Sequence, residues 1–300
     1  MRDNTKTRIF GKILTMLCIV LAIFGGGYFL LDKVVVPKYF GTYGIHGVPD
    51  LVGVVTSLYK SPKESKFVTN GYTQIDLSNA IEKLQIANYQ IGDDGVITEE
   101  NMQNFKGSGE LRLTDKEFAA VCNKLIENGM LNEALPNLNY LNVLNISVLQ
   151  VIIKPTETEI VENNKFDQAN IGFIAKIETD DIREQIANQM ETPVFLLNMI
   201  IPDVLYFEVS YDFDLTKQEG ERVSNGSIAI NNRTSKQSKI LIDLLIDFIF
   251  PTEDEMNLEK FTNEVGKIAL EGIDALGNFT FASDLGSLNK EYGLIVNPTV

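Results

Sequence analysis

The spacing of Ser57 and Lys60 is the feature of this sequence that comes closest to a catalytic motif. Ser-x-x-Lys is the spacing in which a lysine activates a nucleophilic serine, and Ser57-Leu58-Tyr59-Lys60 matches it. The Lys-Thr-Gly element that accompanies this motif is missing, and Ser287-Leu288-Asn289 is a poor substitute for its Ser-Asp-Asn element. We therefore interpret the match as a coincidence.

Two pairs of carboxylates suggest calcium binding or acid-base chemistry. Asp93-Asp94-Gly95 resembles half of a calcium-binding loop, but Asn101 stands where the bidentate glutamate would be. Asp243 and Asp247 lie one helical turn apart, as a general acid and base could. Since like charges at that spacing repel each other, a solvated stripe on a helix is the simpler interpretation. The sequence predicts an ordinary turn and a polar helix face here.

Cysteine and histidine, the usual ligands and nucleophiles, are scarce. The sequence contains two cysteines, Cys18 and Cys122, and one histidine, His46. These cannot form a disulfide framework, a cysteine-based zinc site or a histidine pair. We therefore expect no catalytic residues, no metal and no cofactor, and a protein that is not an enzyme. A hydrolase whose site these patterns do not reveal is the alternative.

Length and charge narrow the class of protein further. With 300 residues, 44% of them apolar and 22% charged, the chain can build a sizeable core in one large or two ordinary domains. It has 26 basic and 41 acidic residues, for a formal net charge of -15. Because a nucleic-acid-binding surface must neutralise phosphates, this charge argues against nucleic acid as a partner.

The N-terminal region has the pattern of a membrane anchor. Ile13 to Leu31 are nineteen consecutive residues without a charge, and at ~1.5 Å per residue such a helix nearly spans a hydrocarbon core of ~30 Å. The preceding basic residues, Arg2, Lys6, Arg8 and Lys12, predict a cytoplasmic N-terminus. A cleaved signal peptide is the alternative, but the run is long for one and an Ala-x-Ala site is missing. We expect a single-pass protein of the cell membrane.

The part of the chain beyond the anchor is strongly acidic. Four of the 26 basic residues and one of the 41 acidic residues precede residue 32, so the remainder carries a formal charge of -18. Such a surface is repelled by anionic headgroups and by phosphate-rich polymers. Any further contact with a membrane should therefore use apolar side chains.

The chain divides into four segments in this interpretation. Residues 1–12 form a cytoplasmic tail, 13–31 a transmembrane anchor, 32–66 a juxtamembrane stalk rich in glycine and proline, and 67–300 an extracytoplasmic α+β domain. The stalk is expected to be irregular apart from a short helix opened by Pro49. The apolar face of that helix, with Leu51 and Val54, either lies against the membrane or docks on the domain.

Apolar periodicity predicts the elements of the domain. A period of 3.6 indicates helices after an Asp76 N-cap and from Thr114, where Glu117 completes a capping box and Cys122 faces the core. Further helices are expected at 179–190, 235–250 and 254–276. A period of 2 indicates strands at 146–153, 171–177, 205–215, 228–230, 279–282 and 292–297, with a turn at Asn225-Gly226.

Two of these elements have more apolar surface than one packing face needs. The strand from Leu205 is about twice the usual length, and the helix at 235–250 is apolar nearly all round. Together they predict an apolar ligand groove, lined by Leu205, Phe207, Val209, Tyr211, Phe213, Leu241, Leu244, Leu245 and Phe248.

The order of elements resembles a known family. An anchor, a stalk, an amphipathic helix opened by Leu113-Thr114-Asp115-Lys116-Glu117-Phe118, long antiparallel strands and apolar helices follow each other. This order is similar to that of the tubular lipid-binding (TULIP-like) extracytoplasmic domains of anchored bacterial proteins, such as the YpmS-like proteins, over roughly Gly107 to Leu276. The resemblance implies a long, curved antiparallel sheet that wraps a helix and leaves a groove for acyl chains.

Two functional hypotheses follow. In the first, the protein is a membrane-anchored, non-enzymatic envelope protein whose outer domain binds or shelters lipid-like molecules. In the second, the domain is a structural or interaction module that recruits another envelope protein and has no lipid ligand.

Overall fold

A computed structural model shows an α+β fold with two antiparallel sheets. It describes residues 28–58, 63–97, 106–129, 145–156, 164–189, 191, 193–218, 221–234, 278–283 and 291–297, and single residues or short groups between 239 and 266. The predicted α+β class is confirmed. One long sheet was expected, and a second, smaller sheet accompanies it.

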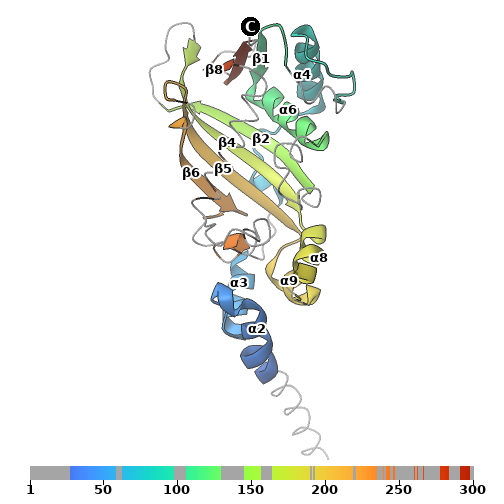
Figure 1. The fold of residues 1–300 in the computed structure, drawn as a ribbon, viewed down its shortest axis with the longest axis vertical. Helices are drawn as coiled ribbons and strands as arrows, with labels where there is room; N and C mark the ends of the chain where they lie inside the picture. Colours follow the sequence, from blue (N-terminus) through green and yellow to red (C-terminus); the bar gives the residue numbers. More distant parts are fainter. Residues whose placement is uncertain are drawn as a thin grey trace, which may run out of the picture.

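The larger sheet contains the long strands that the alternating pattern predicts. Its strands, in spatial order, are β2 (Asn145–Pro155), β4 (Gln168–Glu178), β5 (Val204–Asp214), β6 (Val223–Ile230) and β7 (Arg233–Thr234). Their length lets the sheet run between the two ends of the molecule (Figure 1).

A strand from near the C-terminus, β9 (Gly293–Asn297), lies in the middle of the smaller sheet. The order of this sheet is β1 (Leu111–Thr114), β9, β8 (Asn278–Ala282) and β3 (Lys165–Phe166). β9 pairs with β1 on one side and with β8 on the other. The two strands predicted near the C-terminus are therefore confirmed, and they lie beside α4 and α6 at one end of the molecule (Figure 1).

Helices α4 (Gln74–Ile86) and α6 (Asp115–Glu127) begin with capping boxes. The predicted box of Thr114 and Glu117 is confirmed, with hydrogen bonds in both directions. The N-cap of α4 is Thr73, and Asp76 is its partner at the third helical position, which corrects the sequence prediction. The two helices are joined by an ion pair in which Lys83 Nζ lies 2.6 Å from a carboxylate oxygen of the buried Glu117.

The segment predicted as an irregular stalk is mostly helical, so that prediction was wrong. It forms η1 (Leu31–Val35), α2 (Val36–Phe40), η2 (Gly41–Tyr43), α3 (Val48–Leu58) and η3 (Glu64–Lys66). Gly44 ends η2 with φ of 79°, a left-handed conformation that favours glycine. The helix predicted after Pro49 is confirmed, and Leu51 on it is buried in the core, so α3 docks on the domain.

Two helices precede β5 on the same side of the molecule as the N-terminal helices. These are α8 (Asp180–Gln189), which the sequence predicts, and α9 (Val194–Ile200), which it does not. The side chain of Arg183 in α8 is buried and pairs with Asp180 and with Asp203, 2.7 Å away, while it also donates to the carbonyl of Ile201. These contacts fix α8 to the end of α9 and to the start of β5.

Two large hydrophobic cores, and a small apolar cluster of Phe67, Ile174 and Tyr206, lie along the larger sheet. The distal core includes Phe118, Ile153, Phe213, Phe281 and Leu294, and joins α4 and α6 to both sheets. The proximal core includes Val36, Phe40, Ile186, Leu197, Leu205 and Leu241, and joins the N-terminal helices to α8, α9 and the larger sheet. Val209, near the middle of β5, packs against both cores. One face of β5 thus packs against two cores, which accounts for the length of this strand.

Most of the expected anchor at 13–31 lies outside the described residues. The structure describes Tyr28 to Leu31, which are helical and exposed. Within the described part of the chain, no helix combines the length and the apolar character needed to cross a bilayer.

Asn225 and Gly226 do not form the predicted turn but lie inside β6. The pairing of β5 with β6 shifts register between Ser210 and Asp212, and Asn225 has φ of 52°. An asparagine tolerates this left-handed conformation better than most residues, so the Asn-Gly pair supports a bulge within the strand instead of a hairpin turn.

Candidate functional site

The residues of the possible catalytic and calcium motifs are either structural or outside the described residues. Asp94 accepts a hydrogen bond from Val96 N, and Asp93 accepts one from the Gln85 amide, so both carboxylates stabilise the turn. Lys60, Asn101 and Asp247 lie outside the described residues. Asp243 pairs with Lys239 on its own helix.

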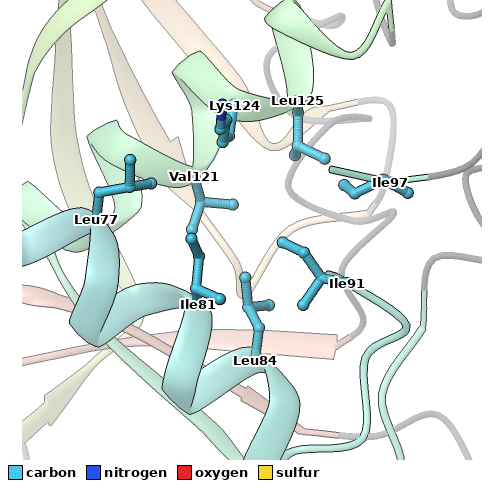
Figure 2. A pocket seen from close by; sticks show the side chains of 8 residues that line it. All are labelled: Leu77, Ile81, Leu84, Ile91, Ile97, Val121, Lys124 and Leu125. Carbon is cyan, nitrogen blue, oxygen red and sulfur yellow. The ribbon is translucent and has the colours of Figure 1, made fainter. Parts of the chain in front are cut away.

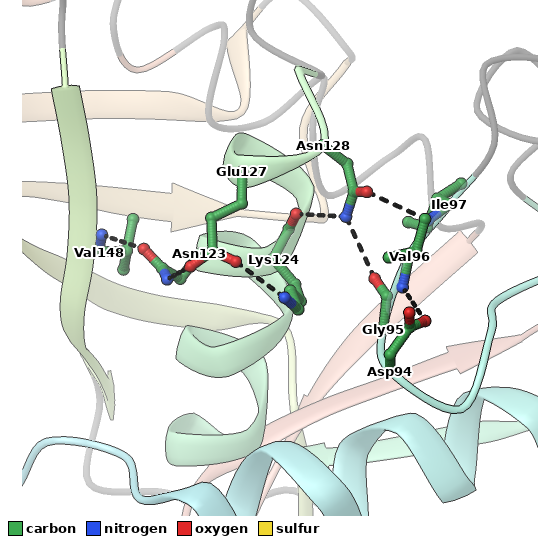
Figure 3. A network of polar contacts seen from close by, with 9 residues as sticks. All are labelled: Asp94, Gly95, Val96, Ile97, Asn123, Lys124, Glu127, Asn128 and Val148. Atoms are coloured by element: carbon green, nitrogen blue, oxygen red, sulfur yellow. Dashed lines mark hydrogen bonds and ion pairs between the residues drawn. The ribbon is translucent and has the colours of Figure 1, made fainter.

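A polar network beside that turn ties α6 to the rest of the domain (Figure 3). Asn128, just after α6, accepts a hydrogen bond from Ile97 N and donates to the carbonyl of Gly95. One turn earlier, Asn123 accepts a hydrogen bond from the buried Val148 N of β2 at 2.9 Å and donates to Glu127. The network satisfies buried backbone groups such as Val148 N and Ile97 N.

Metal ligands do not gather among the described residues, where no three His, Cys, Asp or Glu side chains are close enough to hold an ion. His46 is exposed, and its backbone N–H donates to Asp50. Cys122 is a free, half-buried cysteine that packs against the distal core, and the burial of its thiol raises the pKa of this group to about 12. A thiol with such a pKa is a poor nucleophile at neutral pH.

The described residues of the predicted groove pack in the two cores. Leu205 and Leu241 are fully buried in the proximal core, and Phe207 packs against it. Tyr211 and Phe213 are fully buried in the distal core. Val209 lies between the two. Leu244, Leu245 and Phe248 lie outside the residues whose side chains the structure describes. The described members therefore pack against the protein's own side chains.

Tyr211 shows how tightly this part of the sheet is filled. Its hydroxyl donates a hydrogen bond to the carbonyl of Thr262 at 2.5 Å. A Cβ atom added at Gly226 would lie 2.8 Å from the ring of Tyr211, and one added at Gly266 would lie 2.7 Å from it. Only glycine allows the backbone to approach the ring so closely. Burial raises the pKa of Tyr211 well above its usual value.

A small cavity lies between α4 and α6, where the side chains of Leu77, Ile81, Leu84, Ile91, Ile97, Val121, Lys124 and Leu125 surround it (Figure 2). Its volume is about 10 Å³, which is close to the space of a single water molecule. An acyl chain does not fit there.

Part of the outward face of the larger sheet is polar and hydrogen-bonded across its strands, whereas Ile174 and Tyr206 of the same face are buried in a small apolar cluster with Phe67. Asp212 of β5 accepts hydrogen bonds from Asn170 of β4 and from Asn225 of β6, and Asp214 accepts one from Gln168. Ser227 is exposed and bonds to Ser210 at 2.8 Å. These bonds hold the acidic side chains of this face in defined positions, facing away from both of the large cores.

Exposed apolar side chains concentrate at the N-terminal end of the molecule. We call this region the apolar end and define it by Tyr28, Phe29, Leu30, Leu31, Val34, Val52, Val194 and Phe195. They account for eight of the eleven large apolar side chains that are exposed among the described residues. The elements that carry them, the N-terminal helices and α9, lie together at this end (Figure 1). Larger exposed apolar regions mark contacts with a protein or a membrane.

Asp32 fixes the geometry of the apolar end. Its side chain is largely buried and accepts a hydrogen bond at 2.7 Å from Val48 N, the first residue of α3. It also pairs with Lys33 at 2.9 Å. Hydrogen bonding to Lys33 and to Val48 lowers the pKa of Asp32. Asp32, the first charged residue after the uncharged run, thus links the N-terminal helix to α3.

Comparison with protein-family models, with curated proteins and with solved structures finds no match for this chain. The apolar end and the polar sheet face are therefore the features from which a function must be argued.

Proposed function

We propose that this chain is a membrane-anchored, non-enzymatic protein of the cell envelope, with its N-terminus in the cytoplasm and its α+β domain outside. The apolar end carries this proposal. The uncharged run from Ile13 continues into the exposed helix at Tyr28–Leu31, and the neighbouring elements expose further apolar side chains on the same end of the domain. A membrane at this end would cover them.

Topology tests the proposal directly. A reporter enzyme that functions only after export should be active when it is fused after Val300, because the positive residues before the anchor hold the N-terminus in the cytoplasm. Neutral substitution of Arg2, Lys6, Arg8 and Lys12 should reduce correct insertion. Activity of a cytoplasm-only reporter at Val300 would contradict the proposal.

We propose further that the domain is an interaction module that recruits another envelope protein. The described side chains of the expected lipid groove fill the two cores, which favours this alternative over lipid shelter. The polar sheet face supports it, because its carboxylates are held in fixed positions by cross-strand hydrogen bonds. A partner with a basic surface would complement this face and the acidic charge of the domain.

Site-specific crosslinking tests whether the polar sheet face recruits a partner protein. A photoreactive amino acid at Ser227, which is exposed on the polar face, should crosslink the full-length chain to a discrete partner in intact cells. The same amino acid at Asn188, exposed on α8, is the control. Capture should weaken at high salt because exposed charge pairs are screened.

Native mass spectrometry of the full-length chain separates recruitment from lipid shelter. We expect the detergent-released protein to carry no tightly bound lipid. A stoichiometric lipid adduct that survives detergent exchange would restore the lipid-binding hypothesis, and crosslinking only at Asn188 would contradict the use of the polar face.

A further inference from the structure

Helix α9 exposes two large apolar side chains at its start. Val194 is 41% exposed and Phe195 is 57% exposed, whereas the next two residues, Leu196 and Leu197, are buried in the proximal core. α9 therefore uses one side to hold itself to the domain and presents the other to the surroundings. Single exposed apolar residues are common, but these two belong to the apolar end.

The proximal core, which holds α9, begins a few residues after the end of the uncharged run. Val36 and Phe40 pack in the same core as Leu196 and Leu197. Five residues of helix separate Val36 from Leu31, the end of the uncharged run, which corresponds to about 8 Å at ~1.5 Å per residue. The headgroup layer on each side of a bilayer is roughly 5 to 8 Å thick. An anchored domain would thus hold the N-terminal edge of this core close to the headgroups.

We infer that α9 is a second membrane contact, whose Val194 and Phe195 side chains insert into the interfacial layer of the bilayer beside the anchor. The described residues begin at Tyr28, on this same apolar end, so an anchor that precedes Tyr28 would meet the bilayer on this side of the domain. This inference rests on the proposed membrane anchoring. It adds that the domain lies against the bilayer instead of standing free of it.

The charges near α9 define the lipid chemistry. Glu191, just before α9, is exposed, as are Asp181 and Glu184 of α8. These carboxylates are repelled by anionic headgroups, so insertion depends on apolar contact, and zwitterionic phosphatidylcholine is the suitable bilayer. An aromatic side chain at the boundary of headgroups and acyl chains is typical of interfacial helices.

A tryptophan introduced into the full-length chain tests the inference, because the sequence contains no tryptophan. Phe195→Trp places the only such fluorophore on α9. Ile75→Trp, at a 72% exposed position of α4, is the matched control at the other end of the molecule. Both variants are reconstituted into phosphatidylcholine vesicles with and without brominated acyl chains, and flotation and circular dichroism check insertion and folding.

We expect the emission of Phe195→Trp to shift to the blue and to be strongly quenched by the brominated lipid, while Ile75→Trp keeps the emission of a water-exposed indole. If the vesicles carry the protein but both variants emit alike and neither is quenched, the inference is overturned and the anchor stands. A blue shift without quenching also overturns it, because a protein surface then covers α9. If the chain does not float with vesicles at all, the proposed anchoring itself fails.

Discussion

The hydroxyl of Tyr211 donates a hydrogen bond to the backbone carbonyl of Thr262, at 2.5 Å. This bond joins strand β5 of the larger sheet to a helical residue that lies 51 positions later in the chain. Both residues are buried. We expect Tyr211→Phe to lower the free energy of unfolding by about 0.5–1.5 kcal/mol, because the variant loses one buried hydrogen bond. Urea denaturation measures this. Tyr39→Phe, at a half-buried site near the apolar end, should cost much less.

The glycines around the same ring should be sensitive to a single methyl group. In Gly266→Ala the added Cβ would lie 2.7 Å from a ring carbon of Tyr211, so the ring or the helix must move. Overpacking of this kind costs about 1–3 kcal/mol. Gly53→Ala is the control, since its added Cβ would meet no atom within 4 Å apart from its chain neighbours and the backbone of its own helix. In helix α3 this substitution should stabilise the protein by about 0.5–1 kcal/mol. Equal thermal shifts for the two variants would contradict this account.

Asn123 is expected to be the most important polar side chain of α6. Its side-chain oxygen accepts the hydrogen bond from Val148 N in the buried region between α6 and β2. Asn123→Leu leaves that N–H without this acceptor, and we expect a loss of about 1–3 kcal/mol in the free energy of unfolding. Asn188→Leu, on the exposed side of α8, should change stability by less than about 0.5 kcal/mol. Hydrogen exchange at the Val148 amide should be faster in the Asn123 variant.

The thiol of Cys122 should be inert in the folded protein. Burial raises its pKa to about 12, so in a Cys18→Ser background a maleimide should react only after unfolding. In the unfolded chain the thiol has its ordinary pKa of about 9.0. Because the unfolded state then loses its proton first, the free energy of unfolding should fall as the pH rises from 9 toward 12. Cys122→Ala should remove this part of the pH dependence, and rapid labelling of the native protein would contradict the burial.

Glu208 should destabilise the fold at neutral pH. Burial raises the pKa of this carboxyl, against a smaller opposite effect of a hydrogen bond from the Asn232 backbone, and its Oε1 is buried without a hydrogen-bond partner among the described residues. A folded-state pKa above the unfolded one means that stability is lost as the pH rises through it. Glu208→Gln should therefore raise the melting temperature at pH 7 and have little effect at pH 4. A larger effect at pH 4 would reverse the sign of this argument.

Local signals in the sequence were sufficient for some elements. Thr114 and Glu117 predict the start of α6 because a capping box depends only on residues three apart. The alternation from Leu205 to Leu215 predicts β5 because side chains on a strand alternate between two faces. In both cases the information lies within one element.

The remaining features depend on contacts between distant parts of the chain. Periodicity shows that Leu205 and Tyr211 share one strand face, but not that two different cores cover them. The glycine-rich segment before residue 66 has weak helix propensity, and it becomes helical because Val36 and Phe40 are buried in the proximal core. α9 itself is only seven residues long, too short for a helical period to be recognised.

The position of β9 sets a condition on when the domain can fold. β9 lies between β1 and β8, so residues near 111 and near 280 are brought into one sheet only by residues 293–297. A chain that emerges in order from its N-terminus must therefore expose the edge of β1 until Asn297 has been delivered. If the protein is exported as proposed, β1 stays unpaired outside the membrane until β9 arrives. Chaperones and proteases can bind its exposed strand edge during that time. Late closure of the smaller sheet would thus make export speed, and not only final stability, a determinant of how much folded protein accumulates.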